Sequence, residues 1–375
     1  MIWHRLNERE ELWHYFKIKK NVSMFAPRRI GKSHLMKVFM LEDAKDNNWD
    51  ATYTDLQGCD TAKDAVLTII KDIQEGSYWG SILFNNVAAK LKSVLGGKTP
   101  TSFKDLAQEA SWKDLLDVVL SDLSEQVEKG SKVLIMVDEV TVCATHIFAK
   151  SEADGKQFLN VLSAMRDKYP NIQWLMTGSI GIDHLAQSYQ VQGAFRNLTP
   201  FLLEPFSGEV AKAFVNDYCQ KFVAKPFTLN DDVHNYFQKR LAWLSPHYLA
   251  EFCLRIEPEL INGQYVCTEQ AINLACEKIV AYPYHHIFAG WADHLERNIL
   301  PTYRSICRTI LDLLAKDRPG ITLDNLQIIL GEEVDRKNIE KALRILETDG
   351  FIVKGDDEQY MFVMGLLADY WEGFQ

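Results

Sequence analysis

The residues best suited to chemistry stand near the start of the chain, where residues 26–33 read A-P-R-R-I-G-K-S. Glycine, lysine and serine in this order, between a short apolar run and a helix-like run, are typical of a phosphate-binding loop. Backbone N–H groups at a helix N-terminus would face the anion. Lys32 would supply positive charge to the outer phosphates, and the Ser33 hydroxyl would join the shell of a Mg²⁺ ion. The usual pattern has glycine where this chain has Ala26, so the stretch alone favours a phosphate loop only slightly over a chance turn.

A second group of residues with acid–base chemistry is the pair Asp138 and Glu139, which follows the apolar run at residues 132–137. Ligands of open parallel sheets bind at the carboxyl ends of the strands. Asp138 would hold Mg²⁺ directly or through water, and Glu139 would orient and deprotonate an attacking water molecule. The competing interpretation is an acidic cap on the next helix. The presence of the phosphate-loop pattern and the Asp-Glu pair in one chain favours nucleotide binding.

A third element is the run at residues 172–178, followed by Ser179. A hydroxyl at the tip of a strand beside the Asp-Glu strand would hydrogen-bond the γ-phosphate or the attacking water. Thr177 and Ser179 are the two candidates, and Ser179 is preferred. A plain turn at the end of the strand explains the same hydroxyl nearly as well.

The elements that must position these residues follow from the apolar patterns. Five strands are predicted at residues 22–25, 51–56, 132–137, 172–178 and 197–203. A helix is expected from residue 33 to 40, and residues 61–130 are mostly helical with a break at 96–100. Residues 112–127 repeat apolar positions at helical spacing, which indicates one buried face. Strands alternating with helices predict a three-layer α/β core with a parallel sheet.

The rest of the chain changes character twice. Residues 207–301 carry little strand signal, and residues 302–375 follow the helix and strand order of a winged helix. We therefore predict a core at residues 1–205, a helical lid at 206–300 and a winged helix at 301–375. The last of these has nine Lys and Arg against fourteen Asp and Glu, which makes it a poor general DNA binder.

Composition limits the remaining possibilities. The 375 residues carry a net charge of −10, so any contact with nucleic acid needs a local basic patch. The seven cysteines form no CxxC pair, which favours reduced thiols and a cytoplasmic location. No apolar run approaches the ~20 residues that cross a bilayer, so no membrane contact is expected.

These motifs together resemble the AAA+-like P-loop ATPases, specifically the prokaryotic archaeal-type ATPase group close to the STAND NTPases. The resemblance covers nearly the whole chain. Its matching features are L-N-E-R-E-E-L, F-A-P-R-R-I-G-K-S, Y-T-D-L-Q-G, V-L-I-M-V-D-E-V, W-L-M-T-G-S-I-G, L-L-E-P-F-S-G-E-V-A and the final L-L-A-D-Y-W. It implies ATP or ADP binding with Mg²⁺, slow or stimulated hydrolysis, and a switch or assembly role. Related chains continue into a nuclease-like module, so here a separate effector protein is expected, with a homo-oligomer as a further option.

The resemblance also implies roles for further residues. Arg28 and Arg29 come with the family pattern, although solvated loop arginines are the favoured interpretation. Arg196 stands where related proteins carry an arginine facing the nucleotide, with Arg166 as a competitor. His247 belongs to a lid motif, and a capping or core histidine explains it equally well. The full nucleotide-binding set is Ala26, Pro27, Arg28, Arg29, Ile30, Gly31, Lys32, Ser33, His34 and His247.

Three functions stay open at this point. The first is an ATPase that acts as a nucleotide-dependent switch or assembly factor. The second is a scaffold that binds nucleotide, scarcely hydrolyses it and recruits an effector. The third is a DNA-dependent ATPase from a mobile element or a phage-defence system, which would use Lys337, Lys341 and Arg344 of the winged helix. A solvated helix face is the favoured interpretation of these three cations, so DNA is not favoured.

Overall fold

The computed structural model describes residues 4–76, 80–91, 102, 105–106, 108, 110–178, 182–332 and 334–374. The chain divides into two compact units. The sheet unit comprises Arg5–Ala26 and Lys32–Leu203, and the helical unit includes Pro27–Gly31 and the chain from Glu204 onward. The middle of the predicted phosphate loop therefore belongs to the helical unit, while the two ends of the loop belong to the sheet unit.

The sheet unit is built on five parallel strands in the order β2-β3-β4-β1-β5. Their bounds are β1 Asn21–Phe25, β2 Asp50–Asp55, β3 Val133–Asp138, β4 Ile172–Gly178 and β5 Leu198–Pro200. In the register, Phe25 is paired with Gly178, and Asp55 with Asp138. All carboxyl ends therefore lie at one edge of the sheet, and β4 separates β1 from β3.

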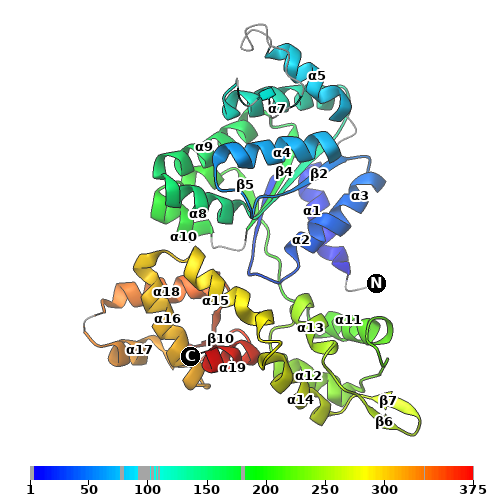
Figure 1. The fold of residues 1–375 in the computed structure, drawn as a ribbon, viewed down its shortest axis with the longest axis vertical. Helices are drawn as coiled ribbons and strands as arrows, with labels where there is room; N and C mark the ends of the chain where they lie inside the picture. Colours follow the sequence, from blue (N-terminus) through cyan, green and yellow to red (C-terminus); the bar gives the residue numbers. More distant parts are fainter. Residues whose placement is uncertain are drawn as a thin grey trace. The chain divides into compact units, whose positions relative to one another are not determined.

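Helices cover both faces of this sheet (Figure 1). One face carries α4 (Ala62–Gly76), α7 (Trp112–Glu128), α8 (Val140–Lys150) and α9 (Glu152–Lys168), and the other carries α1 (Leu6–Lys17) and α3 (Leu41–Asp46). The remaining helical elements are α2 (Lys32–His34), a π-helical turn (Leu35–Met40), α5 (Gly80–Lys90), α10 (Ile182–Tyr189) and a 3₁₀ turn (Gln192–Phe195). The predicted three-layer α/β core with a parallel sheet is confirmed.

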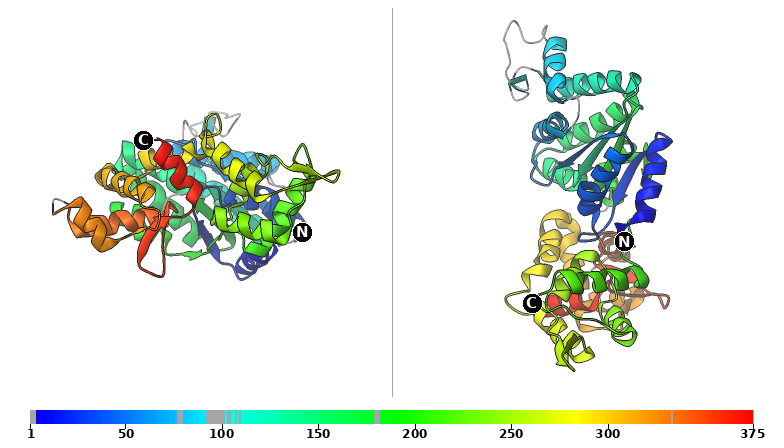
Figure 2. Two further views of the ribbon diagram at one scale, coloured as in Figure 1. Left: turned by 90° about the horizontal axis from the view of Figure 1, so that it is seen from below. Right: turned by 90° about the vertical axis from the view of Figure 1, so that its right-hand side faces the viewer.

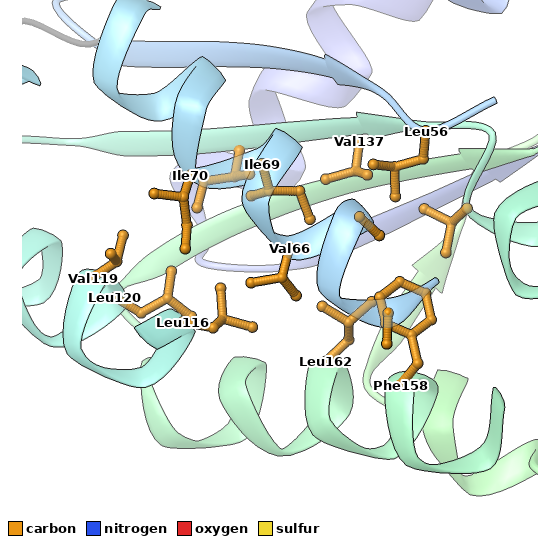
Figure 3. Packing of buried hydrophobic residues seen from close by; sticks show 14 of the residues in the cluster. Leu56, Val66, Ile69, Ile70, Leu116, Val119, Leu120, Val137, Phe158 and Leu162 are labelled. Atoms are coloured by element: carbon orange, nitrogen blue, oxygen red, sulfur yellow. The ribbon is translucent and has the colours of Figure 1, made fainter. Parts of the chain in front are cut away.

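A large core cluster lies on the face covered by α4, α7, α8 and α9. β3 is buried at all six positions. Val133, Ile135 and Val137 join this cluster, and Leu134 and Met136 face the other side because side chains alternate along a strand. Figure 3 shows their partners around Val137: Val66, Ile69 and Ile70 of α4, Leu116, Val119 and Leu120 of α7, and Phe158 and Leu162 of α9. The buried helical face predicted at residues 112–127 is thus confirmed.

The fifth strand is shorter than predicted. The apolar pattern indicates a strand over residues 197–203, whereas β5 ends at Pro200. Pro200 has no backbone N–H, and the last bond to the sheet runs from the Phe201 N–H to the Ser23 carbonyl, 2.8 Å away. The predicted break at residues 96–100 lies outside the described residues.

The first part of the helical unit contains α11 (Gly208–Lys221), α12 (Asp231–Leu241), α13 (Pro246–Cys253), α14 (Glu269–Val280) and α15 (His286–Asn298). It also contains a hairpin of β6 (Glu259–Ile261) and β7 (Gln264–Val266), which the sequence analysis missed. Its turn is Asn262-Gly263, and both residues have positive φ. The hairpin projects from the helices (Figure 2), so its strands lack the buried alternation by which strands are recognised.

The chain continues into a winged helix. Its elements are α16 (Pro301–Lys316), β8 (Ile321–Thr322), α17 (Leu323–Leu330), α18 (Arg336–Thr348), β9 (Ile352–Lys354), β10 (Gln359–Phe362) and α19 (Gly365–Phe374), with the sheet order β8-β10-β9. Asp335 caps α18 by accepting from the Lys337 N–H, and Gly350 ends it with a φ of 78°. None of the described helices is long and apolar enough to span a membrane.

Candidate functional site

The backbone at Ala26 shows whether the missing glycine matters. Ala26 is buried at the end of β1, and its N–H donates to the Gly178 carbonyl at 3.4 Å. Among the residues the structure describes, Ala26 is not one of those with positive φ, whereas Arg29 (67°) and Gly31 (103°) are. The loop therefore needs no glycine at position 26. Its left-handed turns fall three and five residues later, where Arg29 adopts a conformation that non-glycine residues rarely take.

Lys32 and Ser33 begin the helical segment that follows the loop. Lys32 is only 4% exposed, and its Nζ donates to the Ala26 carbonyl oxygen at 2.6 Å. The ammonium group is thus folded back against the start of its own loop. Ser33 is exposed, as is His34, whose ring meets that of Phe39 edge to face at 5.1 Å. Partial desolvation of the imidazole lowers the pKa of His34.

Asp138 is the most enclosed acidic group of the sheet edge, with 1% of its surface exposed. Its Oδ1 accepts from the Thr177 hydroxyl and from the Glu139 N–H at 3.0 Å, and its Oδ2 accepts from the Tyr53 hydroxyl at 3.1 Å. All three donors are neutral. Within the described ranges no cationic side chain forms an ion pair with Asp138, so the carboxylate is oriented without being neutralised.

Tyr53 of β2 contacts Asp138 and lies near Ser33, the two residues predicted to hold Mg²⁺. Its hydroxyl donates to Asp138 Oδ2. Burial raises the pKa of Tyr53, and the charges of Asp138 and Asp55 raise it further, while the Ser33 hydroxyl lowers it. The phenol therefore stays protonated and donates. Tyr53 pairs with Met136 in the sheet, which places it on the same face as Asp138 two residues further along β3.

Glu139 begins α8 in the left-handed region, with a φ of 56° and no capping bond from its side chain. Such a conformation costs on the order of 1–3 kcal/mol in a non-glycine residue, and such residues cluster at functional sites. The neighbouring end of β4, at Gly178, is closely packed. A Cβ built on Gly178 would lie 2.1 Å from the Thr141 Oγ1 and 3.1 Å from the Phe25 ring. Ser179, the predicted γ-phosphate sensor, lies outside the described residues.

In the helical unit, the middle of the loop contacts the predicted lid motif. The Ser245 hydroxyl donates to the Arg29 carbonyl oxygen at 2.5 Å, and a Cβ built on Gly31 would lie 3.8 Å from the Pro246 Cγ. Burial and the nearby charges of Arg29 and Arg255 lower the pKa of His247 to about 4. The ring is therefore neutral at pH 7. Its Nε2 is buried and has no hydrogen-bond partner among the described residues.

Arg28 takes part in a buried hydrogen-bond network that was not predicted from the sequence. Its Nε donates to the His294 Nδ1 at 3.1 Å, and the Asn298 amide is 3.0 Å from the same nitrogen. The His294 Nε2 then lies 2.9 Å from Asp349 Oδ2 at the end of α18. Two donors at Nδ1 place the imidazole proton on Nε2, from which it is donated to Asp349. The interpretation of Arg28 as a solvated loop residue is therefore wrong, whereas Arg29 is exposed.

The other loop residues and the two arginine candidates occupy contrasting environments. Ile30 is buried. Pro27 packs against Gly350, where an added Cβ would lie 2.4 Å from the Pro27 ring. The Arg196 side chain is 76% exposed, with its Nη2 4.0 Å from Asp167. Arg166 is 2% exposed and donates to the Asn197 Oδ1 at 3.0 Å and to the Ala194 carbonyl at 2.5 Å. Burial lowers its pKa to about 10, which fits a role in packing.

The groups at the sheet edge fit a magnesium nucleotide. Mg²⁺ prefers oxygen ligands and is usually held by one or two carboxylates together with substrate phosphates. Asp138 provides an oriented carboxylate, and Ser33 provides an exposed hydroxyl at the start of the helical segment. The part of the chain that the structure describes contains no cluster of three or more His, Cys, Asp or Glu suited to a metal, so the phosphates would complete the coordination.

Comparison with known proteins agrees with this geometry. No protein-family model matches the sequence, and no curated protein does. The Walker-type ATPase PABY2304 of Pyrococcus abyssi superposes with a TM-score of 0.67 at 17% identity, over 98% of this chain and 95% of that one. The chain has the fold of an AAA+-like P-loop ATPase. A second similar structure is the Aeropyrum pernix ORC2 protein in its ADPNP–ADP complexes, with a TM-score of 0.56, 14% identity and coverage of 98% and 92%. Within this AAA+-like fold β4 lies between β1 and β3. Thr177 at the end of β4 is therefore next to Asp138 at the end of β3 and donates to it.

Proposed function

We propose that the protein binds ATP and ADP with Mg²⁺, hydrolyses ATP, and uses this cycle as a nucleotide-dependent switch or assembly factor. The observation that carries the proposal is the buried Asp138 at the carboxyl end of β3, whose carboxylate is held by neutral donors. Lys32 and Ser33 begin the helical segment that follows the predicted phosphate loop. The ORC2 structure, solved as ADPNP–ADP complexes, supports a nucleotide ligand.

In the proposed reaction Lys32 exchanges the Ala26 carbonyl for a phosphate oxygen, and the loop amides donate to the phosphates. Ser33 and Asp138 hold Mg²⁺, which when bound neutralises charge on the phosphates. Glu139 orients a water molecule, whose oxygen attacks the γ-phosphorus while the bond to the bridging oxygen breaks. The proton of the water passes to the Glu139 carboxylate, and ADP and phosphate leave.

Further roles follow the family resemblance. We assign γ-phosphate sensing to Ser179, stabilisation of the transferred phosphoryl group to Arg196, and a lid contact to His247. We further propose a cytoplasmic location and a separate protein effector, with assembly into a homo-oligomer as the form of the switch. DNA stays disfavoured because a cation of α18 is already paired with acids: Arg336 lies 2.7 Å from Asp324 of α17 and 3.5 Å from Glu340 of α18.

The test uses calorimetry for nucleotide binding and phosphate release for turnover. Lys32→Ala should abolish nucleotide binding, because the positive charge beside the outer phosphates is removed. Glu139→Gln should bind ATP normally and lose turnover, because the amide takes up no proton. Lys45→Ala is the matched control, since it removes an exposed lysine from the same helical segment. Unchanged binding in Lys32→Ala would overturn the proposal.

The same assays separate an ATPase from a scaffold that holds nucleotide. Turnover in the wild-type protein that Glu139→Gln removes establishes hydrolysis. Tight nucleotide binding with no measurable turnover, with or without DNA or an added effector, would contradict the ATPase hypothesis and support the scaffold hypothesis.

A further inference from the structure

Tyr53 is the one aromatic hydroxyl among the described residues that contacts Asp138. It comes from β2, whose Y-T-D-L-Q-G stretch is part of the family resemblance but includes no residue to which the sequence analysis gave a role, and its ring is half-buried. Lys37 lies over the ring, with its Nζ 5.5 Å from the centroid, which holds the ring from the side of the helical segment. The hydroxyl is thereby fixed between the loop helix and the end of β3.

The hydrogen bond from this hydroxyl has a defined direction. A phenol has one proton to donate, and that proton goes to Asp138 Oδ2, which is an acceptor only. The bond therefore runs from Tyr53 to Asp138, and it fixes the orientation of one carboxylate oxygen of a predicted metal ligand.

The carboxylate needs this contact because its two oxygens are held differently. Oδ1 is fixed by the Thr177 hydroxyl and the Glu139 N–H, whereas the hydrogen bond from the Tyr53 hydroxyl is the contact that the structure gives for Oδ2. Groups that orient metal ligands from outside the coordination shell change metal affinity by roughly 10–100-fold when removed. The Tyr53 hydroxyl contacts a predicted metal ligand directly, which places it where such an effect is expected.

We propose that Tyr53 is a positioning residue for the magnesium site, which holds Asp138 in the orientation that Mg²⁺–nucleotide requires. This inference rests on the proposed nucleotide function. Tyr53 neither binds phosphate nor takes part in proton transfer. Its removal should therefore weaken the contribution of Mg²⁺ to nucleotide affinity and leave the metal-independent part of that affinity unchanged.

The experiment compares wild type, Tyr53→Phe and the control Tyr15→Phe. Tyr15 lies on α1 and bonds the exposed Glu11 at 3.0 Å, so its variant also loses one phenol hydroxyl. Affinity for a non-hydrolysable ATP analogue is measured by calorimetry across a Mg²⁺ titration and in excess EDTA. In Tyr53→Phe the Mg²⁺ concentration for half-maximal tightening should rise by about tenfold or more. Affinity in EDTA should stay within about twofold of wild type, because the phosphate loop itself is unchanged.

Each result decides one question. A Mg²⁺ titration of Tyr53→Phe that superposes on wild type overturns the positioning role and leaves the proposed function standing. An equal loss of affinity in EDTA also overturns it, because a general structural defect would lower binding with and without the metal. Absence of analogue binding by the wild-type protein overturns the proposed function itself.

Discussion

Two buried aspartates, one in each compact unit, show how differently the same side chain is used in this protein. Asp138 is 1% exposed and accepts from a threonine hydroxyl, a tyrosine hydroxyl and a backbone N–H. Asp349 is 4% exposed and faces His294, which in turn accepts from the Arg28 guanidinium. Burying a charge is costly unless it is paired or hydrogen-bonded, and each carboxylate meets this requirement in its own way.

The difference in their partners indicates which of the two aspartates is suited to bind a cation. The negative charge of Asp349 is linked through an imidazole to a guanidinium, so the helical unit supplies its own countercharge. Asp138 is oriented by neutral donors only, among the residues described, which leaves its charge available to a cation. We infer that Asp138 serves binding and that Asp349 serves the fold of the helical unit and the placement of Arg28.

The largest expected effect is that of Asp138→Asn. The amide keeps the size of the side chain and one accepting oxygen but loses the charge that would hold Mg²⁺. Turnover should fall by about 100-fold or more, because a metal contributes several kcal/mol to the transition state. The free energy of unfolding should change by less than about 1 kcal/mol, because removing a buried carboxylate without an ion-pair partner relieves a desolvation cost, which offsets the hydrogen bonds that the amide weakens. Phosphate release and urea unfolding measure the two quantities.

The control for this variant is Asp46→Asn, which removes an exposed carboxylate from α3 of the same unit. It should match wild type in both assays. Strong destabilisation by Asp138→Asn with turnover preserved would reverse the assignment, since Asp138 would then be the structural aspartate.

Asp349→Asn should show the opposite pattern. Replacing a charged acceptor of a buried hydrogen bond costs about 1.5–3 kcal/mol, so urea unfolding should reveal a loss of that order. The Mg²⁺ dependence of nucleotide binding should be unchanged, because Asp349 lies in the helical unit and is not a predicted metal ligand. Asp356→Asn, an exposed site in the same winged helix, is the matched control. Equal stability of Asp349→Asn and the control would show that the network through His294 contributes nothing to the fold.

The sequence predicted the parts of this comparison that depend on local pattern. An apolar run ending in Asp-Glu marked β3 and its aspartate, and glycine, lysine and serine marked the loop, because such motifs are contiguous in the chain. The strand pattern also predicted β1, β2, β3 and β4 to within one residue at each end. The exposed hairpin β6–β7 was missed because its strands carry no buried alternation.

The partners of the two aspartates could not be predicted, because they come from distant parts of the chain. Tyr53 meets Asp138 only because β2 lies next to β3, and strand order is not written in any single motif. The contact of Arg28 with His294 joins residues 266 positions apart. The sequence also could not show that alanine is tolerated at position 26. That depends on the backbone of the loop, whose positive φ angles fall at Arg29 and Gly31 and not at Ala26.

The smallest expected effect is a pH dependence of stability that comes from His247 of the helical unit and does not involve Asp138. The folded protein lowers the pKa of His247 from its ordinary value near 6.5 to about 4, chiefly through burial. Between these two values the unfolded chain binds more protons than the folded one, so stability rises with pH over this window and is lost as pH falls through it. Because the residue is only partly buried, we expect at most about 1–2 kcal/mol from this histidine.

His247→Gln tests this dependence, because glutamine keeps a polar side chain of similar reach that does not titrate in the window. Urea unfolding at pH 4, 5, 6 and 7 should give a shallower rise of stability with pH for His247→Gln than for wild type. His14→Gln is the control: His14 is an exposed residue of α1 in the sheet unit, and its variant should follow the wild-type curve. Parallel curves for wild type and His247→Gln would show that His247 stays as accessible to protons in the folded protein as in the unfolded chain. The contacts of Ser245 and Pro246 with the loop would then be too loose to exclude water from the neighbouring ring.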